Sequence, residues 1–363
     1  MAQKRYRAGA IGHTGRGNFG HGLHLPYQKI DNVDMIAVAD PDPEGREKAK
    51  TASGAQRSYA DYQEMLAKEA LDLISVCPRW VDSHEALVVA SVEAGCHVYV
   101  EKPIALDLAS ADRMVDVAEA KNRKVAVAHQ GVYLSQVQKA RDLVQEGRIG
   151  KLLSMHATGK QDHRGGGEDM TVLGTHLFNK MRFFGGDPLW LSARVMVGDR
   201  EIEPGDVRQA NEPIGLIAGD GVNALIAFGD GVDGSFVSRV DQTGKGKGYG
   251  LVLVGESGRL AVSGDAGDIS LYDDGVWRPW AGGHGWNSLH LGQDSLQETG
   301  NYNAIVDLID AVENDRDPIS SILGARWALE MIHGAYASQI SGARVHFPLQ
   351  DRANPLAKFA RKI

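Results

Sequence analysis

Residues 11–26, IGHTGRGNFGHGLHLP, carry five glycines, three histidines and an arginine directly after an apolar run. Glycines let backbone N–H groups come close to a pyrophosphate, whereas closely spaced histidines can bind a metal ion. The pair His21-x-x-His24 has no carboxylate or cysteine next to it in the sequence. We therefore expect a phosphate-binding loop here and no metal.

The register of the glycines favours a dinucleotide. The pattern G-x-G-x-x-G binds a pyrophosphate where it joins a strand to the N-terminus of a helix. Gly12-His13-Thr14-Gly15-Arg16-Gly17 matches this pattern at its first and third glycines, with Thr14 in place of the second. The loop thus predicts a helix directly after it, with His24 packed at the start of that helix.

Five apolar runs must position this loop. They cover residues 6–11, 35–39, 71–76, 97–100 and 125–128, and residues 85–94 have a helical period. Strands that alternate with crossover helices form a doubly wound parallel sheet, whose ligands bind at the carboxyl ends of the strands. The residues that follow predicted strands include Gly12, Asp40, Pro78 and Lys102.

Asp40 indicates which dinucleotide to expect. A carboxylate at the end of the second strand can accept both ribose hydroxyls and repels a 2′-phosphate. NAD is therefore favoured over NADP, although Arg46 nearby leaves NADP open as the alternative.

The remaining two thirds of the chain predict a second domain. A chain of 363 residues with 43% hydrophobic content is long enough for two domains, which we place at residues 1–128 and 129–363. Short apolar runs joined by turn residues predict an antiparallel sheet in the second domain, followed by two helices. The runs cover residues 152–158, 189–197, 223–228, 234–239, 249–254 and 259–262, and the helices cover 303–313 and 324–340.

Composition excludes several classes of partner. A formal net charge of −8 disfavours nucleic acid, because phosphate backbones require a basic face. No apolar run approaches the length of a membrane span, so no membrane is expected. Cys77 and Cys96 lie in or beside apolar runs, which is typical of buried free thiols in a reducing cytoplasm.

Several motifs resemble the Gfo/Idh/MocA oxidoreductases, a family named for glucose–fructose oxidoreductase and inositol dehydrogenase. The most specific is AGCHVYVEKP at residues 94–103, preceded by Cys77-Pro78 and His84. Further matches are EGRIG at 146–150, GTHLF at 174–178, FGGDP at 184–188 and RANPL at 352–356. The resemblance implies a Rossmann domain, a second α/β domain with a large open, mostly antiparallel sheet, and homodimers or homotetramers joined through that sheet.

The resemblance also implies a site. In the family, the lysine that corresponds to Lys102 touches the nicotinamide and the substrate, and a cation there eases loss of the hydroxyl proton. Glu101 can pair with that lysine or hold the cofactor. The residues that we expect to contact the cofactor are Gly12, Thr14, Gly15, Arg16, Gly17, Asp40, Cys77, Pro78, His84, Glu101 and Lys102.

His176 is the candidate base, and its surroundings depart from the family pattern. Inositol dehydrogenases carry an acid four residues before this histidine, and Val172 stands there instead. Asp169 and Asn179 are the alternatives that could hydrogen-bond the ring. We also expect His163, Arg164 and Asp169 to bind substrate together with Lys102 and His176, although residues 160–164 are equally consistent with a solvated loop.

These features predict an NAD-dependent oxidoreductase that transfers a hydride between a secondary hydroxyl of a sugar, inositol or related polyol and nicotinamide. Two alternatives stay open. The missing acid at Val172 is also compatible with a glycoside-cleaving enzyme that uses tightly bound NAD for a transient oxidation and elimination. The chain could also be a non-catalytic dinucleotide-binding protein.

Overall fold

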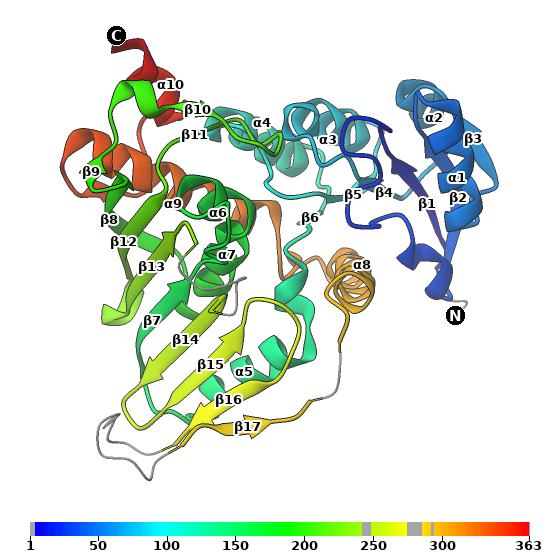
Figure 1. Ribbon diagram of the computed structural model, residues 1–363. Coiled ribbons are helices and arrows are strands. Elements are labelled where there is room, and N and C mark those ends of the chain that lie inside the picture. The colour runs from blue at the N-terminus through cyan, green and yellow to red at the C-terminus, as the bar shows by residue number, and fades with distance from the viewer. Residues whose placement is uncertain (1–3, 242–247, 274–284, 292–293, 363) are drawn as a thin grey trace. The chain divides into compact units, whose positions relative to one another are not determined.

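Figure 1 shows the computed structural model, which describes residues 4–241, 248–273, 285–291 and 294–362. The chain divides into two compact units. The first unit holds residues 1–133, 213–215 and 297–326, and the second holds 134–212, 216–296 and 327–363. None of the helices in the described ranges is long and apolar enough to span a membrane.

The first unit is built on a six-stranded sheet in the order β3-β2-β1-β4-β5-β6, and every strand pair is parallel. Its strands are β1 (Tyr6–Ile11), β2 (Val33–Ala39), β3 (Arg57–Tyr59), β4 (Leu73–Val76), β5 (His97–Val100) and β6 (Val125–Val127). Its helices are α1 (Pro43–Ser53), α2 (Tyr62–Lys68), α3 (His84–Glu93), α4 (Leu108–Ala120) and α8 (Glu298–Glu313), with 3-10 helices η1 (Pro26–Lys29), η2 (Val81–Ser83) and η3 (Gln130–Tyr133). The predicted Rossmann-type sheet is confirmed.

The helix expected directly after β1 is absent. Residues 12–25 form turns, and the first helical element after β1 is the short η1. Gly15, Gly17, Gly20 and Gly22 all have positive φ angles, as does Asn18, and a right-handed helix requires negative ones. The glycines that suggested a phosphate loop therefore prevent the helix that usually follows it, and the prediction that His24 starts that helix is wrong.

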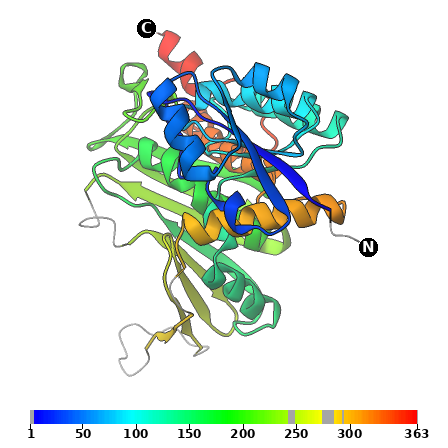
Figure 2. The ribbon, with the colours of Figure 1, turned by 90° about the vertical axis from the view of Figure 1, so that its right-hand side faces the viewer.

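Helix α8 explains why the first unit extends beyond the predicted boundary at residue 128. It packs against β5, β6, η1 and η3 (Figures 1 and 2), and Ala304, Ile305 and Leu308 are fully buried. The segment 213–215 also belongs to this unit, and Pro213 accepts a hydrogen bond from the Val81 N–H at 3.3 Å. The sequence alone places both segments in the second domain.

The second unit contains the predicted large, mostly antiparallel sheet, which has ten strands. Among the described strands, β7 and β13 form its one parallel pair. The strand order is β17-β16-β15-β14-β7-β13-β12-β8-β18, and β9 pairs with β8. These strands are β7 (Leu152–Thr158), β8 (Pro188–Val197), β9 (Arg200–Glu201), β12 (Gly221–Phe228), β13 (Asp233–Arg239), β14 (Gly250–Gly255), β15 (Arg259–Ser263), β16 (Ile269–Tyr272), β17 (Asn287–Leu289) and β18 (Val345–His346). A separate two-stranded sheet joins β10 (Arg208–Gln209) to β11 (Leu216–Ile217).

Helices cover one face of this large sheet. They are α5 (Ser135–Gln145), α6 (Gly167–Val172), α7 (Gly174–Gly185) and the part of α9 (Ile322–Ser341) that follows Arg326. The unit also contains α10 (Pro355–Phe359), which contacts β11, and short 3-10 turns at Pro204–Asp206, Gly229–Gly231 and Ala360–Lys362. The inward side chains alternate along the strands, so that Met155 and Ala157 of β7 are buried. Phe178 of α7 packs on Phe236 of β13, with ring centroids 4.9 Å apart. This core fixes the position of α7, which carries His176.

Candidate functional site

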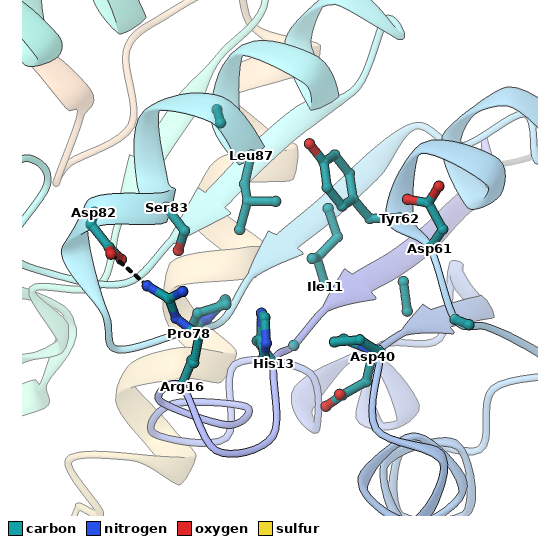
Figure 3. Close-up of a pocket in the computed structure, with 15 residues that line it drawn as sticks. Ile11, His13, Arg16, Asp40, Asp61, Tyr62, Pro78, Asp82, Ser83 and Leu87 are labelled. Atoms are coloured by element: carbon teal, nitrogen blue, oxygen red, sulfur yellow. Dashed lines mark hydrogen bonds and ion pairs between the residues drawn. The ribbon is translucent and has the colours of Figure 1, made fainter.

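A cavity of about 520 Å³ lies at the carboxyl ends of β1, β2 and β4, entirely within the first unit. Ile11, Tyr62 and Leu87 give it apolar walls, and Asp40 and Arg16 border it with opposite charges (Figure 3). Its place agrees with the rule that parallel sheets bind ligands beyond their carboxyl ends. An apolar wall with a few charged groups at its rim suits a nucleotide.

Asp40 holds the glycine loop in place. Its carboxylate is almost fully buried and accepts hydrogen bonds from the Thr14 N–H at 2.9 Å, the Thr14 hydroxyl at 2.8 Å and the Asp42 N–H at 2.9 Å. Figure 3 shows the side chain directed toward the loop. These contacts give Asp40 a positioning role that the sequence pattern did not predict, beside its expected contact with ribose.

The backbone amides of the loop are used within the loop itself. The His13 N–H donates to the Asn18 carbonyl at 3.1 Å, the Gly15 N–H donates to Asn18 Oδ1 at 3.0 Å, and the Arg16 N–H donates to the His13 carbonyl at 2.9 Å. These amides are thus engaged, and no helix starts directly after the loop. The Arg16 side chain brings a positive charge to the cavity, beside the first turns of α2 and α3. That guanidinium lies 4.6 Å from the centre of the Trp80 ring. It also forms an ion pair with Asp82 at 2.5 Å (Figure 3).

Gly17 allows the loop to approach the residues after β4. Its φ is +93°, and a Cβ atom there would lie 2.2 Å from the Arg79 backbone nitrogen. Any other residue would push the loop away from Arg79 and Trp80. The glycine register thus serves close packing against the neighbouring strand end.

Glu101, at the end of β5, forms a second buried polar centre. Its carboxylate is inaccessible to solvent and accepts hydrogen bonds from the His21 N–H at 2.8 Å and the Lys102 N–H at 3.1 Å. The His21 Nδ1 atom lies 2.7 Å from the same carboxylate. Burial alone would raise the pKa of Glu101, but the His21 hydrogen bond and the charges of His21 and Lys102 lower it. Glu101 is therefore a carboxylate in the folded protein.

Lys102 is buried as well, with 7% of its surface exposed. Its positive charge acts on Glu101 and on His129, a histidine that the sequence analysis did not select. Burial, and then the charge of Lys102, lower the pKa of His129 to about 3. His129 is accordingly neutral at pH 7, and Lys102 is the cation of this centre.

His84 and Cys77, both expected to contact the cofactor, are completely buried. The His84 ring lies between backbone carbonyls, with Nε2 2.7 Å from the Pro78 oxygen and Nδ1 3.0 Å from the Pro103 oxygen. It joins the segments that follow β4 and β5, so it positions Lys102 from within the core. Burial raises the pKa of the Cys77 thiol well above its usual value. Pro78, which lies between these two residues in the sequence, does border the cavity.

In the second unit, α7 places His176 in a nearly buried position, with 8% of its surface exposed. Val172, which replaces the family acid, is buried in α6. Asp169 points elsewhere, because its Oδ2 accepts hydrogen bonds from the Gln161 N–H at 3.0 Å and the Ser238 hydroxyl at 2.5 Å. Its Oδ1 is buried without a hydrogen-bond partner, and burial raises the pKa of this carboxyl. Asn179 Oδ1 is likewise buried and unpaired.

Arg164 and His163 have different surroundings from those expected of a sugar pocket. Arg164 is paired with Asp162 at 2.8 Å and with Glu212 at 2.9 Å. The Arg164 hydrogen bond lowers the pKa of Asp162 to about 2. The His163 side chain is 78% exposed. Arg164 is thus held by two ion pairs, whereas His163 is exposed. The role of both residues in binding substrate stays a prediction.

The sequence analysis missed the residues that complete the Glu101 centre. Asn301 of α8 donates from Nδ2 to the His21 carbonyl at 3.0 Å. Its Oδ1 accepts hydrogen bonds from the Tyr99 hydroxyl at 2.8 Å and from Gln130 Nε2 at 3.1 Å. These partners lie up to 280 positions apart in the chain, and no local spacing connects them.

Comparison with known proteins agrees with this architecture. Residues 9–129 match the oxidoreductase family described as having an NAD-binding Rossmann fold, and residues 137–270 match the GFO/IDH/MocA C-terminal domain. The chain belongs to the Gfo/Idh/MocA oxidoreductase family.

Two curated members illustrate the relationship. Myo-inositol 2-dehydrogenase of Thermotoga maritima is 29% identical over 142 residues, which cover 39% of this chain and 42% of that protein. D-apiose dehydrogenase of Paraburkholderia graminis is 28% identical over 200 residues, which cover 52% of each. The chain thus spans about half the length of the curated Gfo/Idh/MocA relatives it matches.

Among solved structures, levoglucosan dehydrogenase in complex with NADH and levoglucosan has the same fold. It superposes with a TM-score of 0.77 at 18% identity, and the alignment covers 95% of this chain and 100% of that one. Both units of this Gfo/Idh/MocA member therefore have counterparts in a solved structure.

We predict that Thr14→Val destabilises the protein by about 1–3 kcal/mol, because the buried Asp40 carboxylate loses a hydroxyl donor at 2.8 Å. Urea unfolding measures this free energy, and a titration with NADH should show weaker binding by the same variant. Thr51→Val, at an exposed position of α1, is the matched control and should change stability by less than about 0.5 kcal/mol. A Thr14→Val protein as stable as the control would contradict the positioning role of Asp40.

Proposed function

We propose that this protein is an NAD-dependent oxidoreductase that acts on a secondary hydroxyl of a sugar, inositol or related polyol. The observation that carries the proposal is the arrangement of the first unit, in which a cavity bordered by Asp40 and Arg16 and the buried Lys102 all lie at the carboxyl edge of one parallel sheet. The names of the relatives, an inositol dehydrogenase and an apiose dehydrogenase, support a polyol substrate.

The first unit fits the cofactor. Its cavity is large enough for an adenosine group, with Tyr62 and Leu87 as apolar walls and Asp40 at the ribose end. Arg16 would exchange its contact with Asp82 for the pyrophosphate. Gly12, Thr14, Gly15 and Gly17 shape the loop beside it, and Pro78 borders the same space. When bound, NAD⁺ supplies the hydride acceptor.

NAD is favoured over NADP by the surroundings of Asp40. The carboxylate repels a 2′-phosphate. Arg46, which could otherwise bind that phosphate, donates to the Asp40 carbonyl at 2.7 Å.

Lys102 positions and polarises the substrate hydroxyl in this proposal. A buried ammonium group stabilises the negative charge that develops on the oxygen as its proton leaves. Glu101 holds the Lys102 backbone, and His84 holds the segment after it. In the second unit, His176 binds the substrate, either as a base or as a ligand. The first unit thus serves as the dinucleotide-binding domain, and the second as the substrate-binding and oligomerisation domain.

The open face of the large sheet supports a homodimer or homotetramer. Six side chains oppose one another across six neighbouring strands of this face: Ser192, Leu225, Ser235, His156, Val252 and Ala261. All but His156 are small or apolar, and the His156 ring contacts the Ser235 hydroxyl at 2.8 Å. Leu225 is 47% exposed. A broad surface of this kind suits self-association. The two buried free thiols, Cys77 and Cys96, are consistent with a cytoplasmic location.

We predict that the purified protein reduces NAD⁺ with at least one member of a panel of cyclitols, pentoses and hexoses, and that Lys102→Met lowers kcat by about 10²- to 10³-fold. NADH absorbance measures both. Lys48→Met, an exposed lysine of α1, is the matched control and should retain the full rate. Analysis of the same reactions for released aglycone tests glycoside cleavage. Cleavage without NADH formation, or full activity in Lys102→Met, would contradict the proposed reaction.

We predict that Leu225→Glu converts the oligomer into smaller species, because an interface related by two-fold symmetry would bury a carboxylate from each protomer. Light scattering after size-exclusion chromatography measures the mass. Val306→Glu, which is 40% exposed on α8, provides the control and should leave the mass unchanged. An unaltered mass for Leu225→Glu would place the interface elsewhere.

A further inference from the structure

We propose that Asp82 and Asn18 compete with the pyrophosphate of the cofactor for hydrogen-bond donors of the glycine loop, so that the cofactor binds by exchange with these two side chains. The inference rests on the dinucleotide site proposed above. It assigns to both residues a role in setting the cofactor affinity, which no motif of the sequence indicates.

Asp82 holds the cation that the loop brings to the cavity. Its carboxylate forms an ion pair with the Arg16 guanidinium at 2.5 Å, and both side chains line the cavity beside Asp40 (Figure 3). A guanidinium binds carboxylate and phosphate oxygens through the same N–H groups. The Asp82 carboxylate therefore takes up donors that a pyrophosphate would use, and its negative charge repels that group.

Asn18 engages a second donor of the loop. Its side-chain oxygen Oδ1 accepts a hydrogen bond from the Gly15 N–H at 3.0 Å. Gly15 follows Thr14, which stands at the second glycine position of the dinucleotide pattern, where the backbone approaches the pyrophosphate. His13 and Arg16, on either side of this dipeptide, line the cavity. The carboxamide oxygen thus binds an amide that the pattern assigns to the cofactor.

Exposure distinguishes these two contacts from the contact of Asp40 with the loop. The Asp40 carboxylate is 1% exposed and accepts hydrogen bonds from the Thr14 N–H and hydroxyl. The Asp82 side chain is 47% exposed and that of Arg16 is 45% exposed, and Asn18 is exposed as well. Removing a buried acceptor is costly, whereas an exposed contact contributes little and is readily exchanged. Asp82 and Asn18 are therefore the acceptors that a ligand can replace.

The backbone closes the loop independently of the Asn18 side chain. The His13 N–H donates to the Asn18 carbonyl at 3.1 Å, and the Asn18 N–H donates to the His13 carbonyl at 2.9 Å, which forms an antiparallel bridge. The φ angle of Asn18 is +54°, and glycine adopts such angles without strain. Replacing Asn18 with glycine therefore removes the competing oxygen and leaves the bridge in place.

Both contacts lower the affinity for the cofactor. Each must break before the Gly15 amide or the Arg16 guanidinium binds a phosphate oxygen, and the cost of breaking it is subtracted from the free energy of binding. The measured dissociation constant is then the intrinsic one divided by the fraction of molecules whose donors are free. Removing a competing acceptor raises that fraction, so the substitution tightens binding although it deletes a contact.

The first test titrates the full-length protein and its variants with NADH, followed by nucleotide fluorescence. We expect Asn18→Gly to bind NADH about 3- to 10-fold more tightly than the wild type, and Asp82→Asn about 2- to 5-fold more tightly. Asn18→Asp puts a charged acceptor of the same size on the Gly15 amide and should bind NADH about 10-fold more weakly. Contacts that only held the loop in its binding shape would give the opposite sign for the first two variants.

Two controls match these substitutions. Asn122 is also exposed with a positive φ angle, +49°, and it follows α4, so Asn122→Gly should leave the NADH affinity unchanged. Asp34 is 41% exposed and ion-paired with Arg5 near the start of β2, so Asp34→Asn should leave it unchanged as well. Urea unfolding of each variant measures whether the fold is kept.

Two shorter ligands separate the pyrophosphate from the rest of the cofactor. ADP carries a pyrophosphate and adenosine carries none, and the affinity of each is measured by its displacement of NADH. We expect the gain in Asn18→Gly and Asp82→Asn to appear with ADP and to be absent with adenosine. An equal gain with both ligands would mean that the variants reshape the cavity, and it would overturn the inference.

The outcomes also separate this inference from the proposed function. If the wild type binds NADH and either Asn18→Gly or Asp82→Asn binds it equally or more weakly, the competition is refuted while the oxidoreductase proposal stands. If neither the wild type nor any variant binds NADH, the cofactor site itself is wrong and both proposals fail.

A second readout follows the Gly15 amide directly. In protein whose glycines carry a nitrogen label for NMR, the Gly15 signal is the one missing from Gly15→Ala, a variant in which the added Cβ atom would meet no atom within 4 Å. We expect ADP to shift this signal in the wild type, and to do so at a lower concentration in Asn18→Gly. A Gly15 signal that bound ADP leaves unchanged would overturn the role of Asn18.

Discussion

The buried carboxylate of Glu101 is the interaction on which the first unit depends. Burying a charged group costs several kcal/mol of folding free energy unless hydrogen-bond donors surround it. The Glu101 carboxylate is contacted by the His21 N–H, the His21 ring and the Lys102 N–H. These donors come from the loop after β1 and from the chain that leaves β5. By binding both, Glu101 holds the glycine loop to the segment that carries Lys102.

Asp40 acts in the same way at the other half of the sheet edge. Its carboxylate accepts hydrogen bonds from the N–H and the hydroxyl of Thr14. Glu101 in the same way binds the N–H and the ring of His21. Together the two acids hold a loop of turns where a helix would otherwise stand. The consequence is electrostatic, because the loop amides bond within the loop and the Arg16 side chain is the positive group that this loop brings to the cavity.

Much of this could be predicted from the sequence, and the failures have physical causes. Apolar runs ending at Gly12, Asp40, Pro78 and Lys102 revealed the parallel sheet and its ligand-binding edge. Strand β3, with the sequence Arg-Ser-Tyr, carries no apolar signal and was not predicted. The helix expected after Gly17 is absent because several residues of this segment have positive φ angles. The prediction failed because the same glycine spacing occurs both in loops that lead into a helix and in loops that do not.

The site was harder to predict than the fold. The motif marked Glu101 and Lys102, but the partner of Glu101 is His21, 80 positions away, and only the tertiary structure joins them. His84 looked like a cofactor contact because it lies close to a strand end, yet burial turns its ring toward carbonyls. Asp169 was selected for its charge, and Ser238, distant in sequence, engages it instead.

The most direct measurement is a crystal structure of the protein with NADH bound. Our account predicts the adenosine between Tyr62 and Leu87, the pyrophosphate at Arg16 after that residue leaves Asp82, and the nicotinamide on the side of Lys102. Cofactor bound away from the carboxyl edge of the six-stranded sheet, or a nicotinamide remote from Lys102, would contradict it.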